Sequence, residues 1–399
     1  HQGNDLGVDS NNPNVPTGYT KGMPYRSKVT DATGKVYSET TTAYVADNDL
    51  AAPWYTPQSQ IDTYLCESGT CASHTRTTFA YDHQFGNLSY ETHYGDLASA
   101  YDDRAIYRTY SDNVTDWIVG LPTRESHYNS SNTSSVNLVA QKTFLYDGTG
   151  GCASPNGTTT PTKGHLTKAT NWLSVTGAEY DVWGNITCTR DANGNVSTVT
   201  YDSTKTFPTT TTNPLGHVTT TQYYGVDGQV VDKGLYGQVK SVTDPNGQVT
   251  LMEYDRVGRK TKVTAPDGGI TSLAYNYGTG FSVGTQHVMT TLSGAGLVSP
   301  LASWNYFDGL GRSVRKEATA PDNKITVTEI QYESRGAIRQ KSLPYFKTLE
   351  SAAGRWSTSS HDALGRVIRL DSPDGTRSLV CFNDWVTGTI DAADHRKRV

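Results

Sequence analysis

Aspartate and arginine recur four residues apart in the second half of the chain, and a glycine precedes each arginine. A row of guanidinium groups could bind an anionic ligand or an acidic polypeptide. Alternatively, each arginine could pair with the turn aspartate of its own or an adjacent hairpin, as opposite charges do across strands. We favour the second interpretation, because stacked repeats would arrange such pairs as a ladder. The pairs are Asp255 with Arg259, Asp308 with Arg312, and Asp362 with Arg366.

Other chemistry finds little support in the sequence. Calcium-binding β-roll repeats carry Gly-Gly-x-Gly-x-Asp in short tandem units, and this chain has no such tandem, so turn formation explains its Asp and Gly residues. The ten histidines are scattered, without a His-Glu-x-x-His motif, and no Gly-x-Ser-x-Gly elbow is present. The sequence therefore predicts a protein that is not an enzyme and that has no cofactor or metal site.

Five cysteines are present, and two of them are close together. Cys66 and Cys71 lie in Cys-Glu-Ser-Gly-Thr-Cys, which could close a small disulfide loop in an exported protein. Cys152, Cys188 and Cys381 have no close partner in the sequence. Zinc would require four suitably placed ligands, so two neighbouring cysteines favour a disulfide over a metal site.

These residues belong to a phrase that returns through the chain: an aromatic residue or histidine, Asp, two variable residues and Gly. A second phrase, such as Asp244-Pro-Asn-Gly, alternates with it. Successive aromatic positions lie 21 or 22 residues apart, as Tyr180, Tyr201 and Tyr223 do. A fixed period of this kind indicates a repeat architecture. The structural repeat positions are Tyr180, Asp181, Gly184, Tyr254, Asp255, Gly258, Arg259, Phe307, Asp308, Gly311, Arg312, His361, Asp362, Gly365 and Arg366.

One repeat has the length of one β-hairpin, with two strands of about six residues and two turns of about four. Segments between the turns, such as Val249–Tyr254, are rich in β-branched and aromatic residues. In the turns, Asp can accept a backbone N–H two residues on, and Gly supplies a positive φ. We therefore expect positive φ at Gly184, Gly258, Gly311 and Gly365.

The composition favours a sheet that exposes both faces to solvent. Only 35% of the 399 residues are hydrophobic, yet 25 Tyr, 7 Trp and 8 Phe argue against disorder. Thr is abundant on both parities of the strands, and neither face of Val196–Tyr201 is cleanly apolar, whereas a sandwich would alternate more sharply. The predicted fold is all-β: stacked β-hairpins that form a curved, single-layer sheet.

Three regions are expected along the chain. Residues 1–30 are extended and linker-like, residues 31–116 form irregular β-structure from early divergent repeats, and residues 117–399 form the hairpin array. Residues 96–107 could include a short helical turn. Insertions are predicted at residues 224–237 and 279–303, where loops at the edge of the sheet would offer binding contacts.

The repeated phrases resemble those of RHS or YD-repeat proteins, most clearly over residues 175–399. Tyr81-Asp-His-Gln-Phe-Gly-Asn and residues 116–124 resemble early repeats of the toxin-complex B-type chains. The resemblance implies that the sheet is part of a hollow β-shell, which encloses a polypeptide in toxin members and displays domains in cell-surface members. The chain lacks the core segment and toxin tail of the toxin-bearing pattern, so the sequence does not identify a cargo.

The resulting functional hypothesis is a structural wall of an exported bacterial RHS-repeat protein, secreted or at the cell surface. Its partners would be other RHS-repeat segments, an enclosed polypeptide, or copies of itself joined through strand edges. The alternative is an adhesin or carbohydrate-binding module, for which Trp172, Trp183, Trp304, Trp356 and Trp385 are the better contact candidates. The net charge of −5 with dispersed basic residues argues against nucleic-acid binding. The sequence contains no run of 18 apolar residues, so no membrane span is expected.

Overall fold

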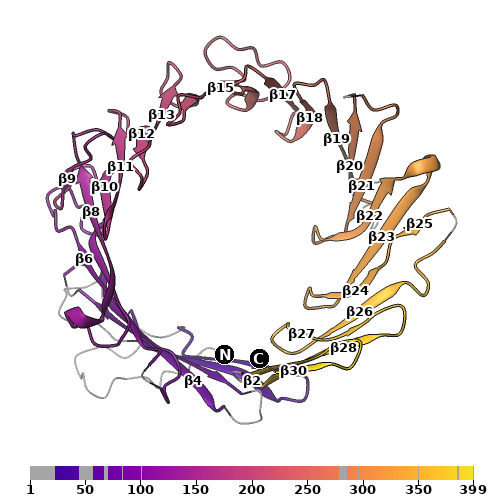
Figure 1. The fold of residues 1–399 in the computed structure, drawn as a ribbon, viewed down its shortest axis with the longest axis horizontal. Coiled ribbons are helices and arrows are strands. Elements are labelled where there is room, and N and C mark those ends of the chain that lie inside the picture. The colour runs from indigo at the N-terminus through magenta and orange to yellow at the C-terminus, as the bar shows by residue number, and fades with distance from the viewer. Residues whose placement is uncertain are drawn as a thin grey trace. The chain divides into compact units, whose positions relative to one another are not determined.

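The computed structural model of the chain describes residues 23–44, 57–66, 71–82, 84–99, 101–277, 285–294, 296–348, 350–383 and 386–398. The chain divides into two compact units. The first contains residues 1–196, 381–388 and 398–399, and the second contains residues 197–380 and 389–397. Within each unit the strands follow one another in chain order along a curved sheet (Figure 1).

In the first unit, each strand pairs antiparallel with its successor, except that β10 pairs with β8 while β9 forms a short side ladder on β8. A 3₁₀ turn, Ser135–Asn137, precedes β8. The strands are β1 Arg26–Thr30, β2 Val36–Tyr44, β3 Gln58–Leu65, β4 Ser73–Tyr81, β5 Leu88–Tyr94, β6 Arg104–Tyr110, β7 Pro122–Tyr128, β8 Leu138–Asp147, β9 Gly157–Thr158, β10 Leu166–Asn171, β11 Ser174–Tyr180 and β12 Ile186–Arg190.

The second unit continues the same antiparallel pattern, with β25 pairing beside β24 on β23. A second 3₁₀ turn is Pro321–Asn323. The strands are β13 Val196–Tyr201, β14 Pro208–Thr212, β15 Val218–Tyr223, β16 Val239–Thr243, β17 Val249–Tyr254, β18 Lys260–Thr264, β19 Ile270–Asn276, β20 His287–Ser293, β21 Leu301–Phe307, β22 Ser313–Thr319, β23 Ile325–Tyr332, β24 Ile338–Ser342, β25 Tyr345–Phe346, β26 Trp356–His361, β27 Val367–Asp371, β28 Arg377–Asn383, β29 Val386–Ile390 and β30 Arg396–Arg398. Of these, β13, β28, β29 and β30 lie across the unit divisions.

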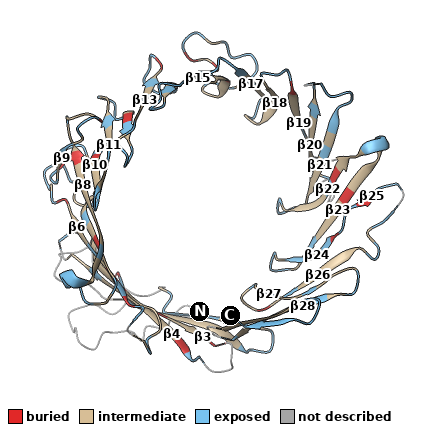
Figure 2. Cartoon of the chain, viewed as in Figure 1, coloured by how far each residue is buried: buried red, intermediate tan, exposed pale blue. Residues whose placement is uncertain are grey.

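The prediction of an all-β, single-layer fold is confirmed. The described residues contain no α-helix and only ten buried residues in the apolar class, among them Ala105, Tyr146 and Val327. Most strand residues are half-buried, and buried positions are few and scattered (Figure 2). The accessible area is 23935 Å², whereas a compact protein of this mass would expose about 15,000 Å². One layer of sheet explains the excess, because neither face is covered by a second layer.

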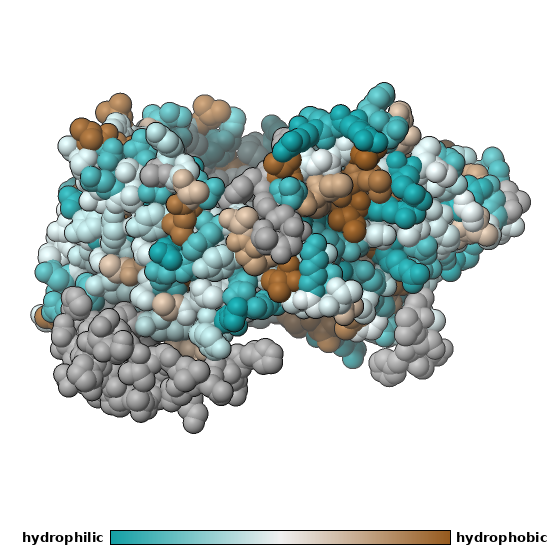
Figure 3. All heavy atoms as spheres, turned by 90° about the horizontal axis from the view of Figure 1, so that it is seen from below, coloured by the Kyte–Doolittle hydropathy of each residue, from teal (hydrophilic) through white to brown (hydrophobic). Residues whose placement is uncertain are grey.

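The surface is consistent with this small amount of apolar burial. Hydrophobic residues form separate small groups between polar ones on the face drawn in Figure 3. Among the described residues, no helix has the length and apolar character needed to cross a membrane.

Two sequence expectations differ from the structure. Residues 279–303 were expected to form an insertion, but they include β20, because His287–Ser293 pairs with both β19 and β21. Residues 96–107 form turns and the start of β6 rather than a helical turn, since Arg104–Tyr107 pairs with β5. In the segment predicted to be linker-like, residues 26–30 form β1, and residues 1–22 lie outside the described residues.

Candidate functional site: the aspartate–arginine turns

The two repeated phrases occupy opposite edges of the sheet within each unit. Successive antiparallel strands place alternate connections at alternate edges. Strands that end in the repeated aromatic, such as β11, β17 and β21, finish at one edge, which we call the aromatic edge. Turns such as Asp244–Gly247 and Ser372–Gly375 lie at the opposite edge. Each phrase therefore has its own edge, and the predicted Asp–Arg turns of the second unit lie along its aromatic edge.

The turn at Asp308 shows how five residues form one unit. The Gly311 N–H bonds to the Asp308 carbonyl at 3.0 Å, and Gly311 has φ +78°. The Oδ1 atom of Asp308 accepts the N–H groups of Leu310 and Arg312 at 3.0 and 2.9 Å. Its Oδ2 atom accepts Nε and Nη2 of Arg312 at 2.8 and 2.7 Å. This is a type I turn followed by a glycine bulge, closed by one carboxylate.

The same geometry returns at the other predicted Asp–Arg pairs. Asp255 holds Arg259 through Nε at 2.7 Å and Nη2 at 2.6 Å, and Asp362 holds Arg366 at 2.8 and 2.6 Å. The guanidinium groups are therefore bound within their own turn. Gly184, Gly258 and Gly365 also have positive φ, of 86°, 86° and 80°.

Neighbouring groups stabilise the charged forms of these turns. Burial raises the pKa of the Asp255 and Asp308 carboxyls, but backbone N–H groups and the paired arginine outweigh it and hold each pKa below its ordinary value. The guanidinium groups of Arg259 and Arg312 each lie over a tyrosine of the next repeat. The Cζ atom of Arg259 is 4.2 Å from the ring centre of Tyr275, and that of Arg312 is 4.4 Å from Tyr332.

Other turns at this edge use a different partner for the aspartate. Asn185 replaces arginine after Asp181 and donates Nδ2 to Oδ2 of that residue at 3.1 Å. Asp202 instead accepts the N–H groups of Thr204, Thr206 and Phe207 at 3.1, 2.7 and 2.8 Å. The recurring requirement is therefore a carboxylate that binds the turn backbone, and arginine is one of several ways to complete it.

The repeated tyrosine has a role that the sequence pattern did not specify. Its hydroxyl donates to the carbonyl of the first residue of the preceding strand, which follows the previous turn at the same edge. Each repeat is thereby tied to the turn before it. The bonds join Tyr81 to Gln58 (3.0 Å), Tyr110 to Leu88 (2.7 Å), Tyr146 to Pro122 (2.6 Å), Tyr180 to Leu166 (3.2 Å), Tyr223 to Pro208 (2.8 Å), Tyr275 to Lys260 (2.9 Å) and Tyr332 to Ser313 (2.8 Å).

Three predicted aromatic positions make other contacts. Tyr254 lies edge-on to Tyr224, with ring centres 6.3 Å apart. Phe307 has no hydroxyl group, and its N–H bonds to the Gln286 carbonyl at 2.9 Å. The His361 side chain is buried, with Nδ1 4.0 Å from Oε2 of Glu333. The aromatic position therefore tolerates several side chains, while the turn beside it keeps its form.

A charge ladder crosses four strands of the first unit. Arg108 of β6 lies between Glu91 of β5 and Glu125 of β7, at 3.2 and 3.0 Å, and Lys142 of β8 is 3.7 Å from Glu125. Burial raises the pKa of Glu125, but hydrogen bonds from His127 and Arg108 outweigh it and lower that pKa. Opposite charges on neighbouring strands attract each other, so these groups stabilise strand register. Sequence reasoning missed the ladder, because its members are 17 residues apart and only the register aligns them.

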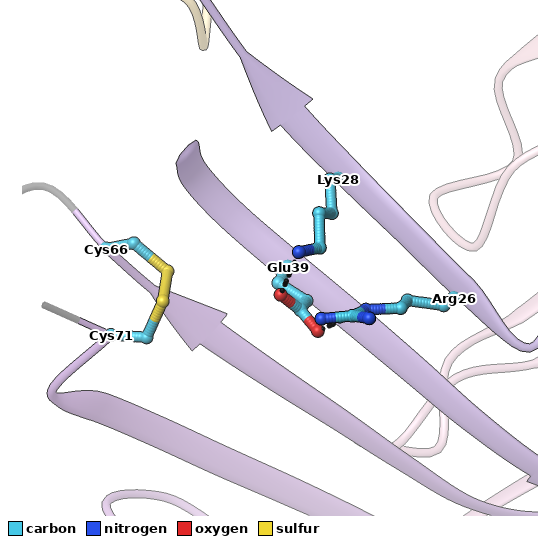
Figure 4. The surroundings of a disulfide bond; sticks show 5 residues. All are labelled: Arg26, Lys28, Glu39, Cys66 and Cys71. Atoms are coloured by element: carbon cyan, nitrogen blue, oxygen red, sulfur yellow. Dashed lines mark hydrogen bonds and ion pairs between the residues drawn. A yellow bond between two sulfur atoms is a disulfide. The ribbon is translucent and has the colours of Figure 1, made fainter. Parts of the chain in front are cut away.

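Two disulfides join four of the five described cysteines, and Cys381 is free. Cys66 and Cys71 are bonded at the ends of β3 and β4, near the Glu39 pair with Arg26 and Lys28 (Figure 4). Cys152 and Cys188 are also bonded, although neither has a close partner in the sequence. Their 36-residue separation gave no local signal, and they meet because the loop after β8 returns to β12. Glu179 lies beside them, but sulfurs joined to each other are not thiolate ligands for a metal.

The tryptophans differ in how accessible they are. Trp172 is 55% and Trp183 is 73% exposed, whereas Trp304 and Trp356 are half-buried in β21 and β26. Trp385 lies outside the described residues. The loop at 148–156 packs over β11, where Gly177 faces Pro155.

Comparison with known proteins assigns the repeat. Residues 236–270, which include the Asp255–Arg259 turn, match the RHS Repeat family. This segment of the chain is therefore an RHS repeat. A search of curated proteins found no match to the chain.

Solved structures share the fold of the chain. TcdB2-TccC3 without its hypervariable C-terminal region matches with a TM-score of 0.71 and 12% identity, covering 94% of this chain and 28% of that one. TcdB2-TccC3 matches at 0.70 and 14% identity, with 94% and 26% coverage. The Photorhabdus luminescens Tc holotoxin pore matches at 0.71 and 13% identity, with 94% and 28% coverage. The chain thus has the fold of these toxin-complex chains and spans little more than a quarter of their length.

Proposed function

We propose that the chain is a structural wall of an exported bacterial RHS-repeat protein, and that the wall encloses or displays a toxin-like polypeptide. The single-layer sheet carries the proposal. Its 23935 Å² of accessible surface leaves both faces available, so one face can line a space while the other meets solvent. The likeness of the fold to toxin-complex chains supports the same role.

The geometry of the repeated turns supports a structural rather than a catalytic role. The carboxylates of Asp255, Asp308 and Asp362 each bind their own turn and its arginine. A general acid or base must instead reach a substrate proton. These groups therefore stabilise the edge of the wall.

The two disulfides support export. Structural disulfides persist in oxidising compartments, such as the bacterial periplasm and the extracellular space. The Cys152–Cys188 bond fixes a loop onto the sheet at a separation of 36 residues. We therefore assign the protein to the secreted or cell-surface fraction, with other RHS-repeat segments and an enclosed polypeptide as its partners.

A glycan-binding role is the second candidate, favoured by the exposure of Trp172 and Trp183. Exposed indole rings can stack on the apolar faces of sugars. An array of immobilised glycans tests this role directly. Binding that is lost in Trp172→Ala and Trp183→Ala, and kept in Trp356→Phe, would favour the adhesin over the wall.

Enclosure can be tested with a reporter. An unstructured reporter polypeptide is joined after Val399, and its cleavage by trypsin is compared with that of the same reporter added as a separate molecule. We expect the joined reporter to survive longer, because a wall restricts access of the protease. Equal cleavage rates would contradict enclosure. Small-angle scattering gives an independent check: a compact chain of this length has a radius of gyration of about 21 Å, and a wall must exceed it.

A further inference from the structure

The aromatic edge of the second unit carries an exposed apolar surface. Six side chains on the connection between β15 and β16 and on the next two connections at this edge have exposed fractions from 44% to 72%. We call this set the apolar edge surface. It consists of Val230, Val231, Leu235, Tyr236, Val257 and Tyr277.

Contacts within the unit show that these side chains form one surface. A Cβ placed on Gly225 would lie 2.9 Å from Val231 and 2.6 Å from Tyr236, so those two side chains flank the same glycine. A Cβ on Gly258 would lie 3.5 Å from Leu235, which places Leu235 beside the turn that carries Val257. Arg259, on the same turn, lies 5.2 Å from the ring centre of Tyr277.

Internal contacts hold the surface in place. Tyr224 and Val226, at the start of the loop, are buried. The Tyr254 N–H donates to the Lys233 carbonyl at 2.7 Å, and Nε2 of Gln238 donates to the Gly258 carbonyl at 2.9 Å. The loop is therefore bound to the next repeat, and a partner would meet a surface already formed, which lowers the entropic cost of binding.

Turn chemistry does not explain the apolar residues. The third position of a turn favours Asn, Asp or Gly. At the opposite edge of the same strands, two turns carry Asn246 and Asp267 at that position, and a third carries Leu215. At the aromatic edge the position holds Val257, and Leu310 in a later turn. Turn chemistry therefore does not require Val257 to be apolar, and its exposure beside five other exposed apolar side chains indicates a contact with another molecule.

We propose that the apolar edge surface binds the same surface of a second copy of this chain. The six side chains expose about 600 Å² on each copy, so two copies would bury about 1,200 Å², the lower limit for a stable protein interface. Exposed charges flank it with opposite sign, Asp232 beside Val231 and Arg256 beside Val257. A two-fold axis brings each of these charges to its opposite on the other copy. This proposal does not depend on the proposed function.

Sedimentation velocity over a concentration series tests the proposal on the full 399-residue chain. We expect a reversible monomer–dimer equilibrium, weakened at least about tenfold by Val231→Asn with Val257→Asn, because each change acts twice in a symmetric dimer. Leu215→Asn is the matched control. It makes the same kind of change at an exposed turn leucine of the opposite edge, and it should leave the equilibrium unchanged.

Charge reversal separates a specific interface from general stickiness. Arg256→Asp alone should weaken the dimer, and adding Asp232→Arg should restore it, because the exchanged pair has the same complementarity. Circular dichroism of each variant verifies that the sheet is retained. A chain that stays monomeric throughout the series overturns the proposal. Dimers that survive the double valine variant, or that dissociate in Leu215→Asn, also overturn it.

Discussion

Replacing Tyr146 by Phe removes one of the hydroxyl bonds that tie each repeat to the turn before it. Tyr146 is 3% exposed, and its hydroxyl donates to the Pro122 carbonyl at 2.6 Å. The change deletes one oxygen and leaves a carbonyl without that partner. A buried hydrogen bond contributes about 1 kcal/mol, and an unsatisfied buried partner costs about 1–3 kcal/mol. We therefore expect Tyr146→Phe to lower the free energy of unfolding by about 1–2 kcal/mol at neutral pH.

The pH dependence of this difference provides a second measurement. Burial raises the pKa of Tyr146 to about 12, whereas a tyrosine in the unfolded chain titrates near 10. The unfolded state therefore releases the proton first, and the contribution of Tyr146 to stability is complete below pH 10 and is lost as the pH rises towards 12. The difference between wild type and Tyr146→Phe should shrink over this interval.

Urea unfolding followed by tryptophan fluorescence measures both effects. Tyr101→Phe is the control, because Tyr101 is 100% exposed and loses the same oxygen without a buried partner; its stability should match wild type. If Tyr146→Phe is as stable as Tyr101→Phe at neutral pH, or if its difference from wild type does not change between pH 10 and 12, the hydroxyl bonds do not hold the repeats together.

Three further changes test the turns and the covalent links. Gly311→Val should lower the free energy of unfolding by more than about 1 kcal/mol, because φ is +78° there. Gly309→Val in the same turn should change it by less than about 0.5 kcal/mol. Neither site has a heavy atom within 4 Å of a new Cβ, so equal effects in thermal melts would reject the conformational explanation. Cys152→Ser with Cys188→Ser should lower the unfolding free energy by about 4 kcal/mol, as expected when the link that closes a loop of this length is removed. Peptide mapping of the wild type without reduction should recover the two cysteines linked. Recovery in separate peptides would contradict the bond. Burial raises the pKa of Asp202, but hydrogen bonds from Phe207 and Thr204 outweigh it and lower that pKa to about 2. The contribution of Asp202 to stability is therefore present above pH 4 and is lost as the pH falls towards 2. The stability difference between wild type and Asp202→Asn should narrow over that range, and a constant difference would exclude the charge as its cause.

Local sequence determined the repeat and its turns. The Asp308 turn lies within five residues, and its carboxylate, glycine and arginine all act on one another at short range. Such contacts need no distant partner, so residue type and spacing predict them. The 21-residue period then implies one hairpin per repeat, and the strongly polar strands imply a single layer, because they could not supply the core of two.

Tertiary structure decided the contacts between repeats. The hydroxyl of Tyr146 donates to the Pro122 carbonyl, 24 residues away in the sequence, and Cys152 is bonded to Cys188 across 36 residues. Strand β20 was mistaken for part of a loop because its Gly- and Ser-rich flanks resemble an insertion, although both of its neighbours supply hydrogen bonds. Each of these outcomes depends on the register between strands. Register is a cooperative property of the whole sheet, so one period of the sequence determines a turn but does not specify which distant atoms it will face.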